Sequence, residues 1–266
     1  MTTPVLLEYD MAAGVRAFST TRKGGCSQGN YAAFNINYYC GDKRECIEAN
    51  RLSLCHLLGI GMDRLVYPHQ VHDVEVRVVD EAFLALDMHQ RASALEGVDA
   101  VMTHLPGVCI GVSTADCIPV LLYDMEHHAG CAIHAGWRGT VKRIVAKAVK
   151  KMADTFGTQP AMLKVVIGPG ISLEHFEVGD EVYEAFRGAG FDMAAVARRY
   201  DKWHIDLWEA NRLLLVEGGV CPDNIKTAGV CTYAHADRFF SARRLGIDSG
   251  RIFSGIMLEL HHHRWW

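Results

Sequence analysis

Short apolar runs separated by turn residues recur along the chain and limit the folds that it can adopt. Several of these runs are apolar on both faces, which indicates strands in sheets that are covered on both sides. Their length and the turn signals between them predict strands rather than helices. The predicted strands are Val15–Thr20, Val74–Val79, Ala100–Thr103, Val108–Ser113, Pro119–Tyr123, Gly130–Ala135, Leu163–Ile167, Lys226–Val230 and Arg251–Ile256.

Helical periodicity is found between these strands. It is clearest from Thr140 to Met152, where apolar residues recur at helical spacing and basic residues fill the other face, as on a solvated surface. Further helices are predicted at Arg44–Leu58, Asp180–Ala189 and Asp206–Glu217; the last begins with an Asp suited to capping and ends before two glycines. Strand clusters interrupted by single helices, without strict alternation, predict an α+β fold with mixed β-sheets packed together and covered by helices. No repeat or linker marks a boundary, so residues 1–266 are expected to form a single compact domain.

Composition narrows the class of protein. The 266 residues are 50% hydrophobic, which supplies a sizeable core. The formal net charge of −4 gives no field that would draw the chain to nucleic acid or to an anionic membrane, and no apolar run approaches a membrane span. The N-terminus has no signal-peptide pattern, and nine scattered cysteines, an odd number, favour reduced thiols in a cytoplasm over a disulfide framework.

An ionisable ring stands at the end of one predicted strand, in the stretch CAIHAGWRGT. Because side chains alternate along a strand, Cys131 and Ile133 lie on one face and His134 lies on the other. Cys117 lies where the turn Thr114–Asp116 meets another buried strand, and His72 lies just before a third, which starts at Val74. Adjacent strands would bring these side chains together.

Three interpretations of this group remain open at the level of residues. One thiolate and two imidazoles form a three-ligand set for Zn²⁺ that leaves a fourth position for water or substrate, although no local metal-binding signature is present. Alternatively, Cys117 is a nucleophile, His134 is its base, and Asp116 or another acid orients the base. In the third interpretation, a buried cysteine and hydrogen-bonded core histidines have a purely structural role.

Anion-binding candidates lie in turns that contain glycine. Arg22 precedes Gly24 and Gly25, Arg138 lies at the start of the helix after the His134 strand, and Arg243 follows an aromatic pair. Guanidinium groups bind phosphate with two parallel hydrogen bonds, and a helix N-terminus adds free N–H groups. These three arginines are therefore the candidate phosphate ligands. The run His261–His263 at the C-terminus is discounted as a metal site, because terminal histidine clusters usually lie in solvent.

Taken together, these stretches resemble the YfiH family, also called the DUF152, laccase-domain or polyphenol oxidase family. The resemblance runs from FSTTRKGGCSQGNYAAFN through HQVH, STADCIPVLLYD and CAIHAGWRGT to FFSARR, and so covers nearly the whole chain. The resemblance implies a metal site at His72, Cys117 and His134, with Arg22 lining the substrate pocket and Arg243 in a family motif.

The same resemblance implies a zinc-dependent purine nucleoside phosphorylase. Its substrates would be phosphate and adenosine, inosine, guanosine or 5′-methylthioadenosine, and its products free base and ribose 1-phosphate. Adenosine deamination is a companion activity, for which a carboxylate must move protons; Asp116 is the nearest candidate in the sequence.

Two other functions compete with the phosphorylase. A copper-dependent polyphenol oxidase would need a histidine-rich copper cluster, yet the H-x-H pattern occurs only at His261–His263, although a single copper ion could bind a Cys-His-His site adventitiously. A non-enzymatic metal-binding module would hold its ion in a closed four-ligand site. The sequence leaves the oligomeric state open.

Overall fold

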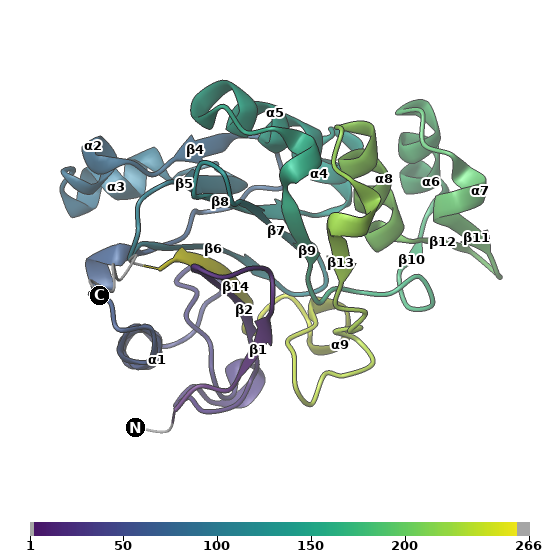
Figure 1. Cartoon of the computed structure of the whole chain (residues 1–266). Coiled ribbons are helices and arrows are strands. Elements are labelled where there is room, and N and C mark those ends of the chain that lie inside the picture. Colours follow the sequence, from purple (N-terminus) through teal and green to yellow (C-terminus); the bar gives the residue numbers. More distant parts are fainter. Residues whose placement is uncertain (1–2, 260–266) are drawn as a thin grey trace.

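The computed structural model describes residues 3–259, and two stacked β-sheets form its centre (Figure 1). The first sheet has the order β1 (Leu6–Tyr9), β2 (Val15–Thr20), β14 (Ile252–Leu258), β6 (Cys109–Thr114) and β3 (Leu65–Val66). The second has the order β13 (Ile225–Thr227), β9 (Lys164–Ile167), β7 (Ile118–Asp124), β8 (Ala129–Ala135), β5 (Ala100–Thr103) and β4 (Val76–Val78). Both are mixed, because β3 pairs in parallel with β6, β4 with β5, and β13 with β9, whereas the other pairs are antiparallel.

Apolar side chains fill the space between the two sheets. Leu121 and Ala132 of the second sheet belong to one buried cluster with Ile110, Val112 and Ile256 of the first. Because alternate residues of each strand face opposite ways, the other faces of the same strands need a cover of their own. This need explains why the runs read as apolar on both faces.

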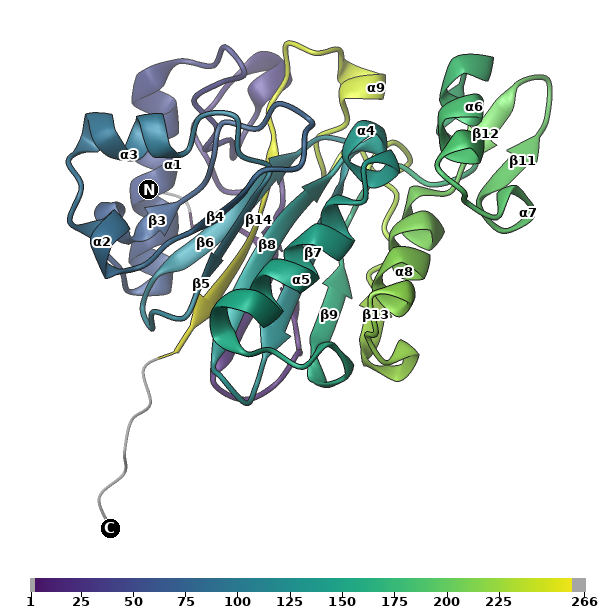
Figure 2. The same cartoon turned by 90° about the horizontal axis from the view of Figure 1, so that it is seen from above.

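Helices cover both outer faces (Figures 1 and 2). Over the first sheet, Leu54 and Leu58 of α1 (Arg44–Leu58) pack with Phe18 and Phe253. Over the second sheet lie α5 (Ile144–Phe156) and α8 (Leu207–Glu217), preceded by the short α4 (Trp137–Val141). The Asp206 side chain accepts a hydrogen bond from the Glu209 N–H and so caps α8, as its position in the sequence predicts.

A third, smaller sheet lies to one side, on the right of Figure 1. It consists of β10 (Glu177–Val178), β12 (Trp203–Ile205) and β11 (Ala197–Arg199), with α6 (Asp180–Gly188) and α7 (Met193–Val196) beside it. The remaining short helices are α2 (Glu81–Leu84), α3 (Met88–Ala94) and α9 (Ala242–Leu245).

The predicted α+β class is confirmed, and each predicted strand is present, although β4 and β13 are shorter than expected. The single helix expected from Thr140 is wrong. The chain is already helical at Trp137, and it breaks at Arg143, whose φ of 65° lies in the left-handed region. Apolar spacing continues across the break, so periodicity alone does not reveal it. The strands of the third sheet, two or three residues each, are too short for alternation to predict.

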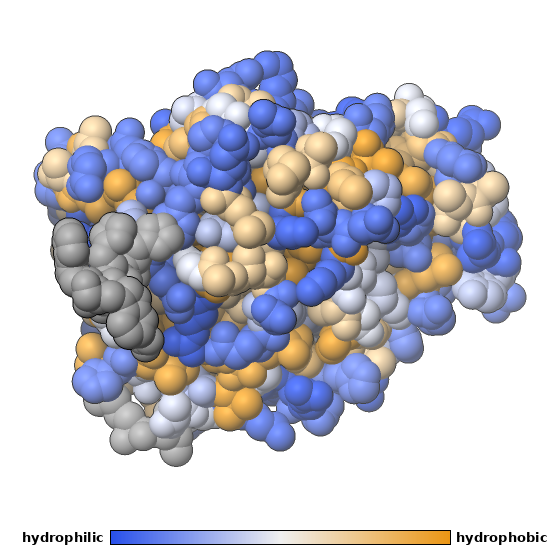
Figure 3. All heavy atoms as spheres, in the orientation of Figure 1, coloured by the Kyte–Doolittle hydropathy of each residue, from blue (hydrophilic) through white to orange (hydrophobic). Residues whose placement is uncertain are grey.

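Polar and apolar residues are interspersed on the face shown in Figure 3. Among residues 3–259, no helix combines the length and the apolar character that crossing a bilayer requires.

Candidate metal centre

The structure brings His72, Cys117 and His134 together at one end of the second sheet. Their ligand atoms all lie within 4.8 Å of one another, and the two imidazole rings meet edge to face with centroids 4.7 Å apart. His134 is buried, Cys117 is partly buried and His72 is exposed. The group is therefore anchored in the protein interior at His134 and open to solvent at His72.

The register of β7 against β8 places the thiol beside the buried imidazole. Pro119 pairs with His134 across the two antiparallel strands, and Cys117 precedes Pro119 by two residues, so its side chain points to the same face. Gly136, next along the chain from β8, makes room for both ligands. A Cβ atom at Gly136 would lie 2.9 Å from Cys117 Sγ, closer than real Cβ atoms approach, and 3.0 Å from His72 Cδ2, which is also an unusually tight contact.

His72 lies in the loop between β3 and β4, and a buried carboxylate fixes that loop. The φ of His72 is 62°, a conformation that a non-glycine residue adopts only when its surroundings impose it. Asp99 imposes it: its carboxylate accepts hydrogen bonds from the backbone N–H groups of Val71 (3.1 Å), His72 (2.9 Å) and Asp73 (2.9 Å).

Asp99 also orients the second imidazole. His134 Nδ1 donates to Asp99 Oδ1 at 2.7 Å, which leaves Nε2 as the nitrogen available to a metal or to the thiol. Asp99 is fully buried and is not among the site residues predicted from the sequence. Its only signal there is a single acid inside the apolar stretch Val98–Val101.

Burial and the neighbouring charges act in opposite directions on the ionisation of the group. Burial would raise the pKa of Cys117, but His134 and His72 outweigh it and lower that pKa to about 6. Burial would lower the pKa of His134, but Cys117 and Asp99 raise it to about 9. Burial also opposes ionisation of Asp99, yet the hydrogen bonds from His134 and the Asp73 and Val71 N–H groups lower its pKa. At neutral pH the thiol is therefore ionised, and a thiolate is the form that binds a metal or attacks an electrophile.

The side chain of Asp116 contacts different groups from that of its neighbour Cys117. Its carboxylate accepts hydrogen bonds of 2.7 Å from Thr232 Oγ1 and from the Arg243 N–H. Asp116 and Arg243 also line an open cleft of about 400 Å³, whose other walls are Ile171, Phe176, Ala242 and Ile247.

The three candidate arginines lie in different surroundings. Arg22 is half-buried: Nε donates to the Ala32 carbonyl (2.7 Å), Nη1 donates to the Ala236 carbonyl (2.5 Å), and the guanidinium lies 4.8 Å from the centre of the Phe240 ring. Burial lowers the pKa of Arg22, although Asp237 partly opposes the effect.

Arg138 is exposed and lies 4.4 Å above the Trp137 ring at the start of α4. Arg243 is exposed over Phe176 (5.5 Å), and its Nη1 donates to the Glu177 carbonyl (3.0 Å). Of the three, Arg243 is the one that lines the cleft. The run His261–His263 lies outside the described residues.

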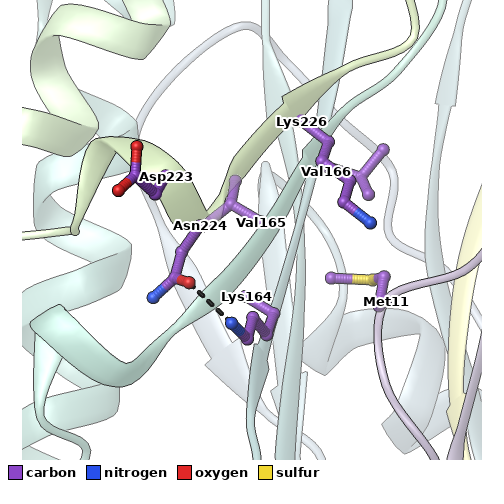
Figure 4. A pocket seen from close by; sticks show the side chains of 7 residues that line it. All are labelled: Met11, Lys164, Val165, Val166, Asp223, Asn224 and Lys226. Atoms are coloured by element: carbon purple, nitrogen blue, oxygen red, sulfur yellow. Dashed lines mark hydrogen bonds between the residues drawn. The ribbon is translucent and has the colours of Figure 1, made fainter.

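A second cavity, of about 70 Å³, carries none of the candidate residues (Figure 4). It is lined in part by Met11, Lys164 and Asn224, and Lys164 Nζ donates to Asn224 Oδ1 at 2.6 Å. Lys164 pairs with Tyr123 near the end of β7 that is remote from Cys117. This cavity is therefore separate from the metal centre.

Known proteins similar to this chain share its length and its fold. Residues 16–259 match the family model described as multi-copper polyphenol oxidoreductase laccase. The chain is 49% identical over 250 residues to a purine nucleoside phosphorylase of Bacteroides thetaiotaomicron, with 93% of each chain covered. It is 45% identical over 246 residues to a protein named adenosine deaminase RL5 from an unknown prokaryotic organism, which covers 91% of this chain and 94% of that one.

Two solved structures have closely similar folds. YlmD of Geobacillus stearothermophilus superposes with a TM-score of 0.87 at 31% identity, covering 93% of each chain. A Bacillus licheniformis protein titled hypothetical protein YfiH gives a TM-score of 0.88 at 28% identity, covering 97% of each chain.

Proposed function

The chain belongs to the YfiH (DUF152) laccase-domain family, and from that premise we propose that it is a zinc-dependent purine nucleoside phosphorylase. The proposed substrates are phosphate and adenosine, inosine, guanosine or 5′-methylthioadenosine. The products are the free base and the sugar 1-phosphate. The observation that carries the proposal is the group of one thiol and two imidazoles whose ligand atoms lie within 4.8 Å of one another.

The residues present fit a zinc ion. One thiolate and two imidazoles match the donor types that zinc takes in proteins, and three protein ligands leave the fourth tetrahedral position for water or substrate. The Asp99 carboxylate holds the His134 ring from behind, as carboxylates commonly do for zinc-ligating histidines. The lack of a side chain at Gly136 keeps the space between Cys117 and His72 clear.

During cleavage of the glycosidic bond the sugar carbon becomes positively charged, and a phosphate anion held close to it would stabilise that charge and act as the nucleophile. Zinc bound by His72, Cys117 and His134 would supply a Lewis acid. We assign the binding of phosphate to Arg22 and Arg243, with Arg138 as a further candidate at the start of α4. Nε and Nη1 of Arg22 already donate to main-chain carbonyls, so its Nη2 is the proposed donor to phosphate.

Adenosine deamination is proposed as a companion activity, because one close relative is named an adenosine deaminase. Proton transfer is assigned to Asp116. Its carboxylate lines the cleft of about 400 Å³ and accepts hydrogen bonds from Thr232 Oγ1 and the Arg243 N–H. The proposed setting is a cytoplasm, in keeping with nine cysteines that are all unpaired.

One specific observation favours a second function, a metal-free hydrolase. Cys117, His134 and Asp99 follow one another as thiol, imidazole and carboxylate, with 2.7 Å between His134 Nδ1 and Asp99 Oδ1. A Cys-His nucleophile has this arrangement. Hydrolytic activity that survives removal of the metal by a chelator would favour the metal-free hydrolase over the zinc-dependent phosphorylase.

The donor set also bears on copper. A multicopper oxidase needs a histidine-rich cluster besides its first copper site. Within residues 3–259, the group at Cys117 is the only set of three or more His, Cys or carboxylate side chains close enough to share an ion. The family description as a polyphenol oxidoreductase therefore has no matching copper cluster in the described part of this chain.

The test uses purified protein of known metal content. Inosine, adenosine and 5′-methylthioadenosine are incubated with and without phosphate, and the products are separated by chromatography. We expect free base only when phosphate is present, at a rate proportional to bound zinc. Cys117→Ala should lose zinc and phosphorolysis together, whereas the matched control Cys221→Ala should keep both. Full phosphorolysis in Cys117→Ala would refute the assignment.

A further inference from the structure

Two thiols outside the metal centre lie against each other at the protein surface. Cys26 lies in the segment after β2, and Cys46 lies in the first turn of α1. Cys26 Sγ is 3.5 Å from the Cys46 carbonyl oxygen, and Cys46 Sγ is 3.5 Å from the Cys26 carbonyl oxygen. Each side chain therefore reaches the other residue's main chain, so the two backbones are near neighbours, as disulfide formation requires.

The surrounding contacts hold this pair in place. The Cys26 N–H donates to Asn50 Oδ1 at 3.0 Å, and Asn50 Nδ2 donates to the Asn35 carbonyl at 2.8 Å. Asn50 is four residues after Cys46 in α1, so the two side chains lie on the same side of the helix. Asn50 is buried and thus anchors the Cys26 segment to the helix that carries Cys46.

The anchored segment is the loop formed by residues 22–34, the Arg22 loop, which is closed by hydrogen bonds at Arg22. The Arg22 carbonyl accepts hydrogen bonds from the N–H groups of Ala33 (2.8 Å) and Phe34 (3.0 Å), and Arg22 Nε donates to the Ala32 carbonyl. Gly25 permits the close approach of the two ends, since a Cβ atom there would lie 2.1 Å from the Ala33 carbonyl oxygen. A covalent bond at Cys26 would fix this loop to α1.

Accessibility distinguishes this pair from the other neighbouring thiols. Cys26 is exposed and Cys46 is partly exposed, whereas Cys55 of α1 and Cys109 of β6 are both buried in the core between that helix and the first sheet. A small oxidant in solution reaches the first pair and not the second.

We propose that Cys26 and Cys46 form a reversible disulfide that fastens the Arg22 loop to α1 under oxidising conditions. In the reaction, one thiolate attacks a small-molecule disulfide such as oxidised glutathione and releases one glutathione thiol. The second thiolate then attacks the mixed disulfide and releases the other. The two protein thiols lose two electrons and two protons, and the glutathione disulfide gains them. This inference does not depend on the proposed reaction at the metal centre.

The test treats the full-length protein with oxidised glutathione under native conditions and maps the product by tryptic digestion without reduction. We expect residues 24–43 to be linked to residues 45–51, with fragment ions that place the bond at Cys26 rather than at Cys40 in the same peptide. Closing a loop of about 20 residues should stabilise the protein by about 3 kcal/mol and so raise the Tm by roughly 6–12 °C, and a reducing agent should reverse the rise.

Matched variants separate the pair from other thiols. Cys26→Ser and Cys46→Ser should each abolish the linked peptide and the rise in Tm, whereas Cys221→Ser should retain both. Glutathione left attached to Cys26 with no link to Cys46 would overturn the proposal. So would a linked product whose Tm equals that of the reduced protein.

Discussion

The replacement Asp99→Asn tests whether one buried carboxylate organises the proposed metal centre. The carboxylate accepts four N–H groups, three from the backbone of residues 71–73 and one from His134. An amide keeps one oxygen and replaces the other with a donor, so in either orientation two of the four N–H groups lose their acceptor. At about 1.5–3 kcal/mol for each hydrogen bond to a charged group, the expected loss of unfolding free energy is about 3–6 kcal/mol.

Two measurements follow from that loss. Thermal unfolding of metal-free protein should show a Tm lower by at least about 6 °C, at roughly 2–4 °C per kcal/mol for a large domain. Competition with a chelating dye should show zinc affinity reduced by about 10–100-fold, because the amide no longer orients both the His72 loop and the His134 ring. Neither measurement depends on catalysis.

The control is Asp73→Asn, the same substitution in the same loop. The Asp73 side chain is 52% exposed and pairs with Lys142 at 2.8 Å. A surface pair of this kind contributes about 0–1 kcal/mol, so both measurements should stay close to those of the parent protein. If Asp99→Asn matched this control in Tm and in zinc affinity, Asp99 would not be a positioning residue.

Three further predictions concern the metal centre, the phosphate site and the pH dependence of stability. Gly136→Ala should weaken zinc binding at least about tenfold, because its Cβ would meet Cys117 Sγ at 2.9 Å. The control Gly188→Ala, whose Cβ meets no atom within 4 Å, should keep the zinc affinity of the parent protein. Equal zinc titrations of the two variants would contradict the prediction. Arg22→Ala should raise the KM for phosphate and leave zinc content unchanged, and steady-state kinetics with unchanged phosphate dependence would remove Arg22 from the site. Asp124→Asn should destabilise the protein by about 1–3 kcal/mol at pH 7, because the buried carboxylate accepts the Glu126 N–H and His127 Nδ1. Burial would raise the pKa of Asp124, but hydrogen bonds lower it below its unfolded value. Its stabilisation is therefore full above the unfolded pKa and is lost as pH falls through the folded pKa, so the difference between the two proteins in urea unfolding should shrink in acid; a constant difference would be evidence against this cause.

Much of the fold could be predicted because burial leaves a local signature. Strands covered on both faces appear in the sequence as continuous apolar runs, and the helix predicted at Arg44–Leu58 coincides with α1. The break at Arg143 could not be predicted, because one residue of left-handed conformation changes the direction of the chain without changing the spacing of apolar residues.

The candidate site was predictable for a related reason. His134 lies within an apolar strand and Cys117 lies directly before another, and a buried ionisable group is costly unless it has a partner. Asp99 also lies directly before an apolar strand, but a single acid in that position does not show which groups it binds. The partners of Asp99 are three consecutive N–H groups more than 25 residues away in the chain and a histidine on β8, the strand that pairs with β5.

Local patterns alone indicate the residue types of the candidate metal centre and the strands in or beside which two of them lie, because period-two alternation assigns each side chain to a face before any contact is known. Which of these groups meet depends on how the strands and loops are arranged in three dimensions. The register of β7 against β8 places Cys117 beside His134, the Asp99 carboxylate folds the His72 loop toward them, and Asp116 is turned away to Thr232. These outcomes depend on hydrogen bonds between segments far apart in the chain, and no local pattern of residues encodes such contacts.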